Sequence, residues 1–434
     1  MSESKTRRIL VCATILAIGI GSPGIASAAS DSPKRFERVA FTAGEIAAAH
    51  PAGLAGTLRI AGDDAQAFQT LIDGAPAASD PWLVLSGGGE NGAFAAGLLS
   101  GWSTTGHRPA FGVITGVSTG ALIAPFAFIG DAGDAALREA YTTVSAADVF
   151  EFGGSSEALT DTWPLKRRIE RAVTPRLLKA IAAEHAKGRR LLVATTELDT
   201  ERPVLWDMGA IATVGDDKAL TLFRSIVLAS SAVPGVFPPV SIDSTILDGK
   251  THQARTIQEM HVDGGTTAPF FLAPKPALVA ALTGSGGVRI PAKTVYLVIN
   301  NKLAPYFQMA THTTLSVLGR AMSSAIKAQT RDALALADAF ARRESLDLKV
   351  TEIDDRFTET SPAPFDQRYM KALFAHAEKL GRAGTAFAGP ETLADGASNL
   401  PTGSLGALHP KAPQPTTPRL DASRPEASQA LATR

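Results

Sequence analysis

Short apolar runs that end at polar or glycine-rich turns recur along the chain, and helix-length segments follow the first two of them. The runs predict buried strands at Trp82–Leu85, Gly112–Thr115, Leu191–Ala194 and Thr294–Ile299. Each run is short, rich in apolar residues and bounded by turn-forming residues, which favours a strand over a helix. Repeated strand–turn–helix units indicate an open α/β sheet, in which ligands gather at the carboxyl ends of the strands.

Weaker patterns predict the remaining elements. A capping box at Thr42–Glu45 predicts a short helix that ends near His50, and Asp63 and Asp64 are candidate caps for a second helix over Ala65–Ile72. The Asp248-Gly249 pair predicts a hairpin turn between neighbouring short strands. The other predicted elements are helices at Ala93–Trp102 and Leu222–Leu228, the hairpin arms Ser244–Leu247 and Lys250–Ala254, a long broken helix at Leu315–Phe340, an edge strand at Leu346–Val350 and a last helix at Tyr369–Leu380.

The two ends of the chain differ in composition from its middle. A basic start, an apolar run at Ile9–Ile20 that is too short to span a bilayer, and the small residues Ala26-Ser27-Ala28 predict a Sec-type signal peptide over residues 1–28. Residues 389–434 are rich in Pro and Ala without periodicity and are predicted to be disordered. We therefore expect an exported protein, periplasmic, secreted or membrane-associated, with an N-terminal extension over 29–80 and a main domain over 81–388.

The charge balance and the cysteine content limit the partners and the catalytic groups that the chain can use. The 42 basic and 42 acidic residues balance, and the absence of a like-charge run argues against a nucleic-acid partner. Cys12 is the only cysteine and lies inside the predicted signal peptide, so the exported chain would have no disulfide and no cysteine nucleophile. Serine becomes the main candidate nucleophile. The basic residues of Leu165–Val173 are either a solvated helix face or a contact for anionic lipid head groups.

A serine flanked by glycines follows the second predicted strand. Gly116, Ser118 and Gly120 fit the G-x-S-x-G pattern between Gly112–Thr115 and a small-residue helix. Glycines on both sides permit the strained strand-to-helix turn that exposes a nucleophilic hydroxyl at a helix N-terminus. Because a short pattern can occur by chance, other motifs in the chain are needed to support a catalytic role for Ser118.

A glycine-rich loop follows the first predicted strand and could hold either of two anions. Gly87, Gly89 and Gly92 fit G-x-G-x-x-G, which binds a dinucleotide pyrophosphate when an acidic residue ends the next strand. The next strand, Gly112–Thr115, has no such acid and leads straight to Ser118. The loop is therefore predicted to stabilise the oxyanion of an acyl-transfer reaction.

An aspartate is the candidate base. Asp263 follows an apolar strand end, and we expect Ser86, Ser118 and Asp263 to meet where strands end at one sheet edge. A Ser–Asp pair would need no metal and no cofactor. His261 is the nearest histidine and defines the alternative, a carboxylesterase with a Ser-His-Asp triad.

Four sequence blocks, in this order, resemble the patatin-like phospholipase family. The resemblance covers about residues 80–305. It implies that 81–388 is a catalytic domain, of which 81–305 is the motif-bearing part. The blocks are Gly87-Gly-Gly-Glu-Asn-Gly92, Gly116-Val-Ser-Thr-Gly120, Ala229-Ser-Ser-Ala-Val-Pro-Gly-Val-Phe-Pro-Pro239 and the D-G-G block Asp263, Gly264 and Gly265. The resemblance implies a three-layer α/β/α sandwich with a mainly parallel central sheet.

The resemblance also implies residue roles. Gly87, Gly88 and Gly89 would form the oxyanion hole, Ser118 would be the nucleophile and Asp263 its proton acceptor. Asn91 stands where the family usually has Arg or Lys, and Ser86 where many members have Asp, which leaves the head group of the substrate open.

The expected activity is hydrolysis of fatty-acyl esters of phospholipids and related lipids, with a lipid or a membrane surface as partner. The alternatives are the His261 triad, a dinucleotide-binding oxidoreductase that uses Gly87–Gly92, and a non-catalytic exported binding protein.

Overall fold

The computed structural model describes residues 38–153, 157–248, 251, 253–305, 307 and 309–387. The predicted signal peptide and the predicted disordered tail lie outside these residues. No helix in the described ranges has the length and the apolar character needed to cross a membrane.

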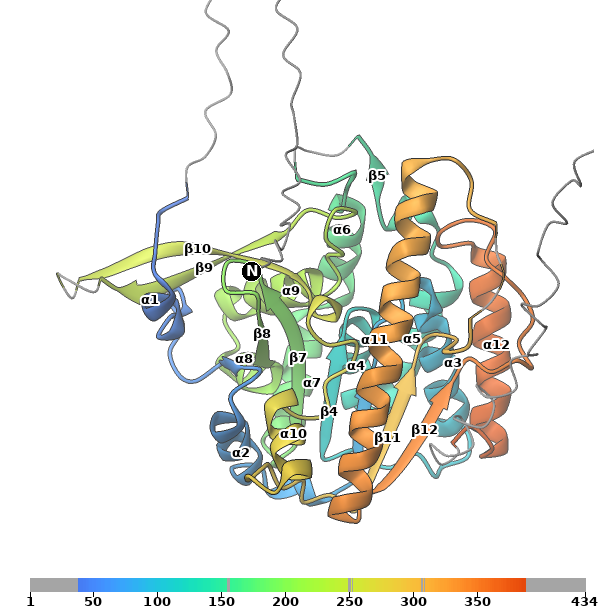
Figure 1. The fold of residues 1–434 in the computed structure, drawn as a ribbon, viewed down its shortest axis with the longest axis horizontal. Helices are drawn as coiled ribbons and strands as arrows, with labels where there is room; N and C mark the ends of the chain where they lie inside the picture. Colours follow the sequence, from blue (N-terminus) through green and yellow to red (C-terminus); the bar gives the residue numbers. More distant parts are fainter. Residues whose placement is uncertain are drawn as a thin grey trace, which may run out of the picture.

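Five parallel strands form the centre of the sheet, in the order β7-β4-β3-β11-β12 (Figure 1). β3 (Trp82–Leu85) and β11 (Thr294–Ile299) have the predicted bounds, and β12 lies at the edge, as predicted. The other three are β4 (Val113–Val117), β7 (Arg190–Glu197) and β12 (Asp347–Glu352).

Antiparallel strands extend the sheet beyond β7. β10 (Ala254–Asp263) pairs with β7 on one side and with β9 (Val240–Leu247) on the other. The two strands pair as the predicted hairpin, but both are longer than predicted: β9 begins at Val240, and β10 continues to Asp263 because it pairs with β9 and then with β7. Gly249 of the predicted turn and Lys250 of the predicted second arm lie outside the described residues. The shorter members are β1 (His50–Pro51), β2 (Arg59–Ala61) and β8 (Arg202–Asp207).

Helices cover both faces of the sheet and form two separate hydrophobic cores. Side chains alternate along each strand, so Leu83 and Leu85 of β3 enter one core while Trp82 and Val84 enter the other. The first core lies under α3 (Gly92–Ser103), α4 (Thr119–Phe128), α5 (Asp134–Thr142), α6 (Trp163–Ala172), α7 (Pro175–His185), α8 (Met208–Val214), α9 (Asp217–Ser230) and α12 (Gln367–Ala383). The second lies under α2 (Ala65–Asp73), α10 (Lys275–Thr283) and α11 (Thr314–Glu344). The fold is the predicted α/β/α sandwich.

Two further features differ from the sequence-based prediction. α11 is one continuous helix of 31 residues, not a broken one. Its single glycine, Gly319, lies near the start with open space around it, and no proline interrupts the helix. A two-stranded hairpin of β5 (Glu151–Phe152) and β6 (Thr160–Asp161) was not predicted, because its strands are too short to show a period.

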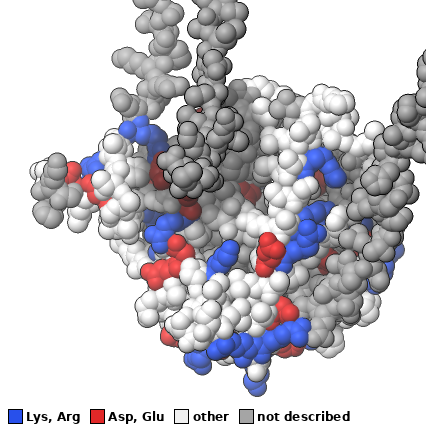
Figure 2. All heavy atoms as spheres, in the orientation of Figure 1, with Lys and Arg blue, Asp and Glu red and all other residues white. Residues whose placement is uncertain are grey.

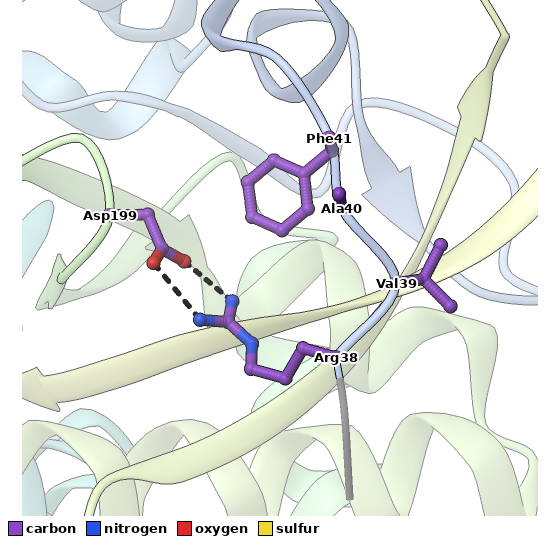
Figure 3. Close-up of a pocket in the computed structure, with 5 residues that line it drawn as sticks. All are labelled: Arg38, Val39, Ala40, Phe41 and Asp199. Carbon is purple, nitrogen blue, oxygen red and sulfur yellow. Dashed lines mark hydrogen bonds and ion pairs between the residues drawn. The ribbon is translucent and has the colours of Figure 1, made fainter.

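The N-terminal segment is anchored beside β10. Thr42 and Glu45 form the predicted capping box of α1 (Ala43–Ala47), which ends before His50. Arg38 donates two hydrogen bonds to the carboxylate of Asp199, at 2.9 and 2.5 Å (Figure 3). Together with Val39, Ala40 and Phe41, these two residues line a surface cavity of about 190 Å³. The lining contains neither Ser118 nor Asp263, so we assign this cavity to the anchoring of the segment.

Candidate active site

Ser118 occupies the sharp turn between β4 and α4. Its backbone has φ 55° and ψ −123°, a strained conformation for a residue with a side chain. The neighbouring glycines are needed for close packing: a Cβ on Gly116 would lie 2.5 Å from the carbonyl oxygen of Gly120, and one on Gly120 would lie 2.4 Å from that of Leu85. The predicted G-x-S-x-G turn is thus a nucleophile elbow in its geometry.

The structure brings Ser118 and Asp263 together. Ser118 Oγ donates a hydrogen bond of 2.6 Å to Asp263 Oδ2. The other carboxylate oxygen, Oδ1, accepts from the N–H of Gly265 at 2.7 Å. This second bond fixes the carboxylate so that one oxygen faces the serine.

Asp263 reaches the serine by a different route from the one expected. It does not end a parallel strand, because β10 runs antiparallel to β7, with Asp263 opposite Thr195. β4 ends at Val117, opposite Ala194, whereas β7 continues to Glu197. The antiparallel strand therefore comes back along the overhanging end of β7 and stops at the level of Ser118.

Burial controls the charge of the pair. Ser118 is 8% exposed and Asp263 is 5% exposed. Burial raises the pKa of Asp263 to about 6, and the hydrogen bonds from Ser118 and Gly265 lower it only in part. A carboxylate with this pKa is ionised at neutral pH and is basic enough to accept a proton in a reaction.

The glycine-rich loop lies against the elbow. A Cβ on Gly87 would lie 3.1 Å from Ser118 Cβ. The N–H of Gly87 donates to the carbonyl of Pro269 at 3.0 Å and is not available to an oxyanion in this structure, contrary to the role implied by the resemblance. Within the described ranges, the N–H groups of Gly88 and Gly89 have no hydrogen-bond acceptor, and a Cβ on Gly88 would lie 2.1 Å from the carbonyl oxygen of Asn300.

Asn300 holds this loop, and the sequence reasoning missed it. Its side-chain amide donates to the carbonyl of Ser86 at 3.0 Å and accepts from the N–H of Ala95 at 3.1 Å. Its backbone N–H donates to Ser86 Oγ at 2.8 Å. The available signal was its position directly after the buried strand Thr294–Ile299, beside Ser86, which follows the neighbouring strand.

Ser230 supports the elbow from the other side. Its Oγ accepts a hydrogen bond of 3.0 Å from the N–H of Ser118 and donates one of 2.7 Å to the carbonyl of Ala194. Ser231 Oγ donates to the carbonyl of Val227 within α9 at 3.1 Å. These contacts agree with the interpretation of both serines as supporting or helix-end residues.

The polar residues of the loop contact the α12 region. Asn91 Oδ1 accepts a hydrogen bond of 2.7 Å from the hydroxyl of Tyr369, at the start of α12. Glu90 accepts a hydrogen bond from the N–H of Phe365. The position that is usually basic in the resembling family therefore joins the loop to α12 in this chain.

His261 is not a partner of Ser118. It is fully buried on β10, where Nδ1 lies 3.0 Å from Thr195 Oγ1 and Nε2 lies 3.2 Å from Glu259 Oε2. Both ring nitrogens are thus occupied away from the elbow, and the geometry does not support the triad. Among the described residues, no cluster of three or more His, Cys, Asp or Glu side chains could hold a metal ion.

Comparison with known proteins identifies a related family. Residues 83–274 match the family model of patatin-like phospholipases, a range that contains the glycine-rich loop, Ser118 and Asp263. Over this stretch the chain is similar to the patatin-like phospholipases. The mixed α/β architecture with its mostly parallel central sheet is the patatin-like fold, as predicted.

A comparison with solved structures finds a match of low sequence identity. The chain matches the crystal structure of VipD from Legionella pneumophila with 12% sequence identity and a TM-score of 0.30, covering 71% of this chain and 67% of that one. No curated protein matches this chain.

Proposed function

We propose that this protein is a serine acyl hydrolase that cleaves fatty-acyl ester bonds of phospholipids or related lipids with a Ser118–Asp263 dyad. The observation that carries the proposal is the 2.6 Å hydrogen bond between the elbow serine and a buried carboxylate. The match to patatin-like phospholipases supports the lipid class, because members of that family are typically lipid acyl hydrolases. The experiment below tests which ester bond is cleaved and which head group the substrate carries.

In the first half-reaction, Asp263 accepts the proton of the Ser118 hydroxyl as Oγ attacks the ester carbonyl carbon. The carbonyl oxygen becomes negatively charged. We assign its stabilisation to the N–H groups of Gly88 and Gly89 in the loop before α3, because that of Gly87 is bound to Pro269. The intermediate collapses, the carbon–oxygen bond to the alcohol breaks, and Asp263 returns its proton to the departing oxygen.

In the second half-reaction, water hydrolyses the acyl-enzyme. Asp263 accepts a proton from the water as the hydroxide attacks the acyl carbon, and the bond to Ser118 Oγ breaks. The serine recovers its proton from Asp263, and the fatty acid leaves. Every proton transfer uses a carboxylate whose pKa of about 6 is poised for exchange near neutrality.

The test compares the wild-type protein with Ser118→Ala on vesicles of several phospholipids and on neutral esters, with product identification. We expect wild type to release fatty acid and Ser118→Ala to lose activity by about a thousandfold or more. A serine-directed phosphonate should label wild type at Ser118. Ser285→Ala, an exposed serine in the loop after α10, is the matched control and should behave as wild type.

The outcomes separate this proposal from its alternatives. Full activity of Ser118→Ala would overturn the assignment of the nucleophile. Loss of activity in His261→Ala with retention in Asp263→Ala would replace the dyad by another mechanism. Saturable NAD binding without turnover of any ester would favour the oxidoreductase, and neither turnover nor labelling would favour a binding protein.

A further inference from the structure

Large apolar side chains are exposed in two segments that are far apart in the sequence. One segment includes the β5–β6 hairpin and the start of α6, where Phe152 is 68% exposed, and the other leads into α11, where Phe307 is 90% exposed. We call these side chains the apolar edge; its members are Phe152, Leu159, Trp163, Phe307, Met309 and Val317. Exposed apolar side chains gathered in one region mark an interaction surface.

The second segment leaves the sheet beside the candidate active site. β11 is parallel to β3, and β3 is parallel to β4, so the three strands end at one edge of the sheet. β3 leads into the glycine-rich loop, β4 into Ser118, and β11 into Asn300 and then the approach to α11. The first turns of α11 and the β5–β6 hairpin lie at the same end of the molecule (Figure 1).

The hairpin is joined to the loop that supports the elbow. The N–H of Leu159 donates to the carbonyl of Gly235 at 3.0 Å, and that of Thr160 to Val236 at 3.1 Å. These acceptors follow Ser230 and Ser231 on the segment after α9, and Ser230 holds the N–H of Ser118. The hairpin part of the apolar edge is therefore connected, through the residues that follow α9, to the serine that supports the nucleophile.

Basic side chains flank the apolar edge. Lys166, Arg167 and Arg171 are exposed on α6, and within the described ranges none of them forms an ion pair. Glu170 is the acidic side chain on the same exposed face of α6, and the neighbouring hairpin carries the exposed acids Glu151, Glu157 and Asp161. Glu151 accepts a hydrogen bond of 2.5 Å from the indole N–H of Trp163. The Arg167 guanidinium lies 5.6 Å from the ring centre of Trp163. Figure 2 shows an uncharged surface at the upper end of the molecule and basic side chains just below it, and Arg320, in the second turn of α11, is half-buried.

We propose that the apolar edge docks on the surface of an anionic phospholipid bilayer, with Lys166, Arg167 and Arg171 contacting the head groups. This inference rests on the proposed function, since it places the nucleophile where acyl esters are found. Tryptophan and phenylalanine beside lysine and arginine form a composition suited to the membrane interface. Anionic lipids complement the charge of α6 in a way that a neutral apolar partner would not.

The binding test uses the full chain carrying Ser118→Ala, which prevents hydrolysis, with vesicles of phosphatidylcholine alone or mixed with phosphatidylglycerol. Three double variants are compared. The apolar variant is Phe152→Ser with Phe307→Ser, the basic variant is Lys166→Gln with Arg167→Gln, and the control is Lys275→Gln with Val279→Ser. The control residues are exposed on α10, at the other end of the molecule (Figure 1).

We expect stronger binding to the anionic vesicles. The apolar variant should weaken this binding by about tenfold or more. The basic variant should weaken it by about fivefold for each charge removed, and only on anionic vesicles. The control should bind unchanged. With Ser118 restored, all three double variants should hydrolyse a water-soluble short-chain ester at the wild-type rate.

Tryptophan fluorescence reports the contact directly. Trp163 is exposed, whereas Trp82 and Trp206 are fully buried and Trp102 packs against Phe111. Brominated lipids in the anionic vesicles should quench the emission of Trp163, and the quenching should disappear in Trp163→Phe. This readout is independent of any lipid binding by the apolar run near the N-terminus.

Three results would overturn the docking inference. If wild type hydrolyses soluble esters but does not bind vesicles, the docking inference is wrong and the proposed function stands. Equal vesicle binding by wild type and the apolar variant would do the same. Loss of self-association in the apolar variant, with vesicle binding unchanged, would assign the edge to a second copy of the chain. Conversely, docking by a protein that cleaves no ester would contradict only the proposed function.

Discussion

The Asp263 carboxylate combines a catalytic position with a cost in stability. Its folded-state pKa of about 6 lies above the ordinary value of 3.8, because the group is buried without a cationic partner. A raised carboxyl pKa means that the native state binds more protons than the unfolded chain between about pH 4 and pH 6. The contribution of this group to stability is therefore greatest at low pH and is lost as the pH rises through 6.

We predict opposite effects of Asp263→Asn on activity and stability. Ester hydrolysis should fall by about a thousandfold, because the amide cannot accept the serine proton. At about pH 8 the variant should be more stable than wild type by about 1–3 kcal/mol, since no buried charge forms. At about pH 4 the difference should vanish. Urea unfolding at the two pH values measures both effects.

The control for this prediction is Asp131→Asn, at an exposed site before α5, which should leave activity unchanged. In wild type, kcat/KM should rise with pH through about 6 and then level off, because the free Asp263 must be ionised to act as the base. An Asn variant that is less stable than wild type at the higher pH would show that the carboxylate stabilises the fold and would contradict the argument.

At the scale of elements, the strands that carry local signals were predictable. β3 and β11 have the predicted bounds because short apolar runs between turn residues determine them locally. The route of Asp263 was not predictable, since its approach depends on β10 pairing with the overhanging end of β7. Asn300 was missed for a similar reason: its partners, Ser86 and Ala95, lie more than 200 positions away in the sequence. Local patterns do not encode such long-range pairs.

The β3–α3 loop has both a catalytic role and a packing role, and a substitution at Gly88 tests both. In Gly88→Ala, the new Cβ would lie 2.1 Å from the carbonyl oxygen and 2.7 Å from the Cβ of Asn300, so the loop must move. We expect kcat on a soluble ester to fall by about a hundredfold or more, as for the loss of one oxyanion donor. The stability should fall by about 1–3 kcal/mol.

Gly44→Ala is the matched control, because nothing lies within 4 Å of the Cβ position of Gly44 on α1. It should retain wild-type kcat and stability. If Gly88→Ala retained wild-type kcat while losing stability, the loop would have a packing role only, and the oxyanion would have to be held elsewhere.

At the scale of the whole molecule, a buried ion pair ties the N-terminal residues to the strand that carries the base. Arg59 of β2 donates hydrogen bonds of 2.6 and 2.8 Å to the two carboxylate oxygens of Glu259 on β10, and one of 3.1 Å to the carbonyl of Ala49. His261, between Glu259 and Asp263, contacts the same carboxylate. The predicted N-terminal extension is thus part of the support of the site.

This pair gives the molecule a pH dependence of the opposite sign to that of Asp263. Burial alone would raise the pKa of Glu259, but hydrogen bonds from His261 and Arg59 outweigh it and hold the pKa at about 2. A lowered carboxyl pKa contributes stability that is present above the ordinary value of 4.5 and is lost as the pH falls toward 2. Wild type should therefore lose stability on acidification below about pH 4.5, where Asp263 is already neutral.

We predict that Glu259→Gln destabilises the protein by about 3–5 kcal/mol at about pH 7, because it leaves the Arg59 guanidinium buried without its counter-charge. Combining it with Arg59→Met should restore most of the loss, since removing both charges removes the unpaired group. Urea unfolding of the two variants at about pH 7 and about pH 3 measures this, and the single variant should be less sensitive to acid than wild type. A double variant as unstable as the single one would mean that hydrogen bonds to Ala49 and His261, not the charge pair, hold the N-terminal residues against β10.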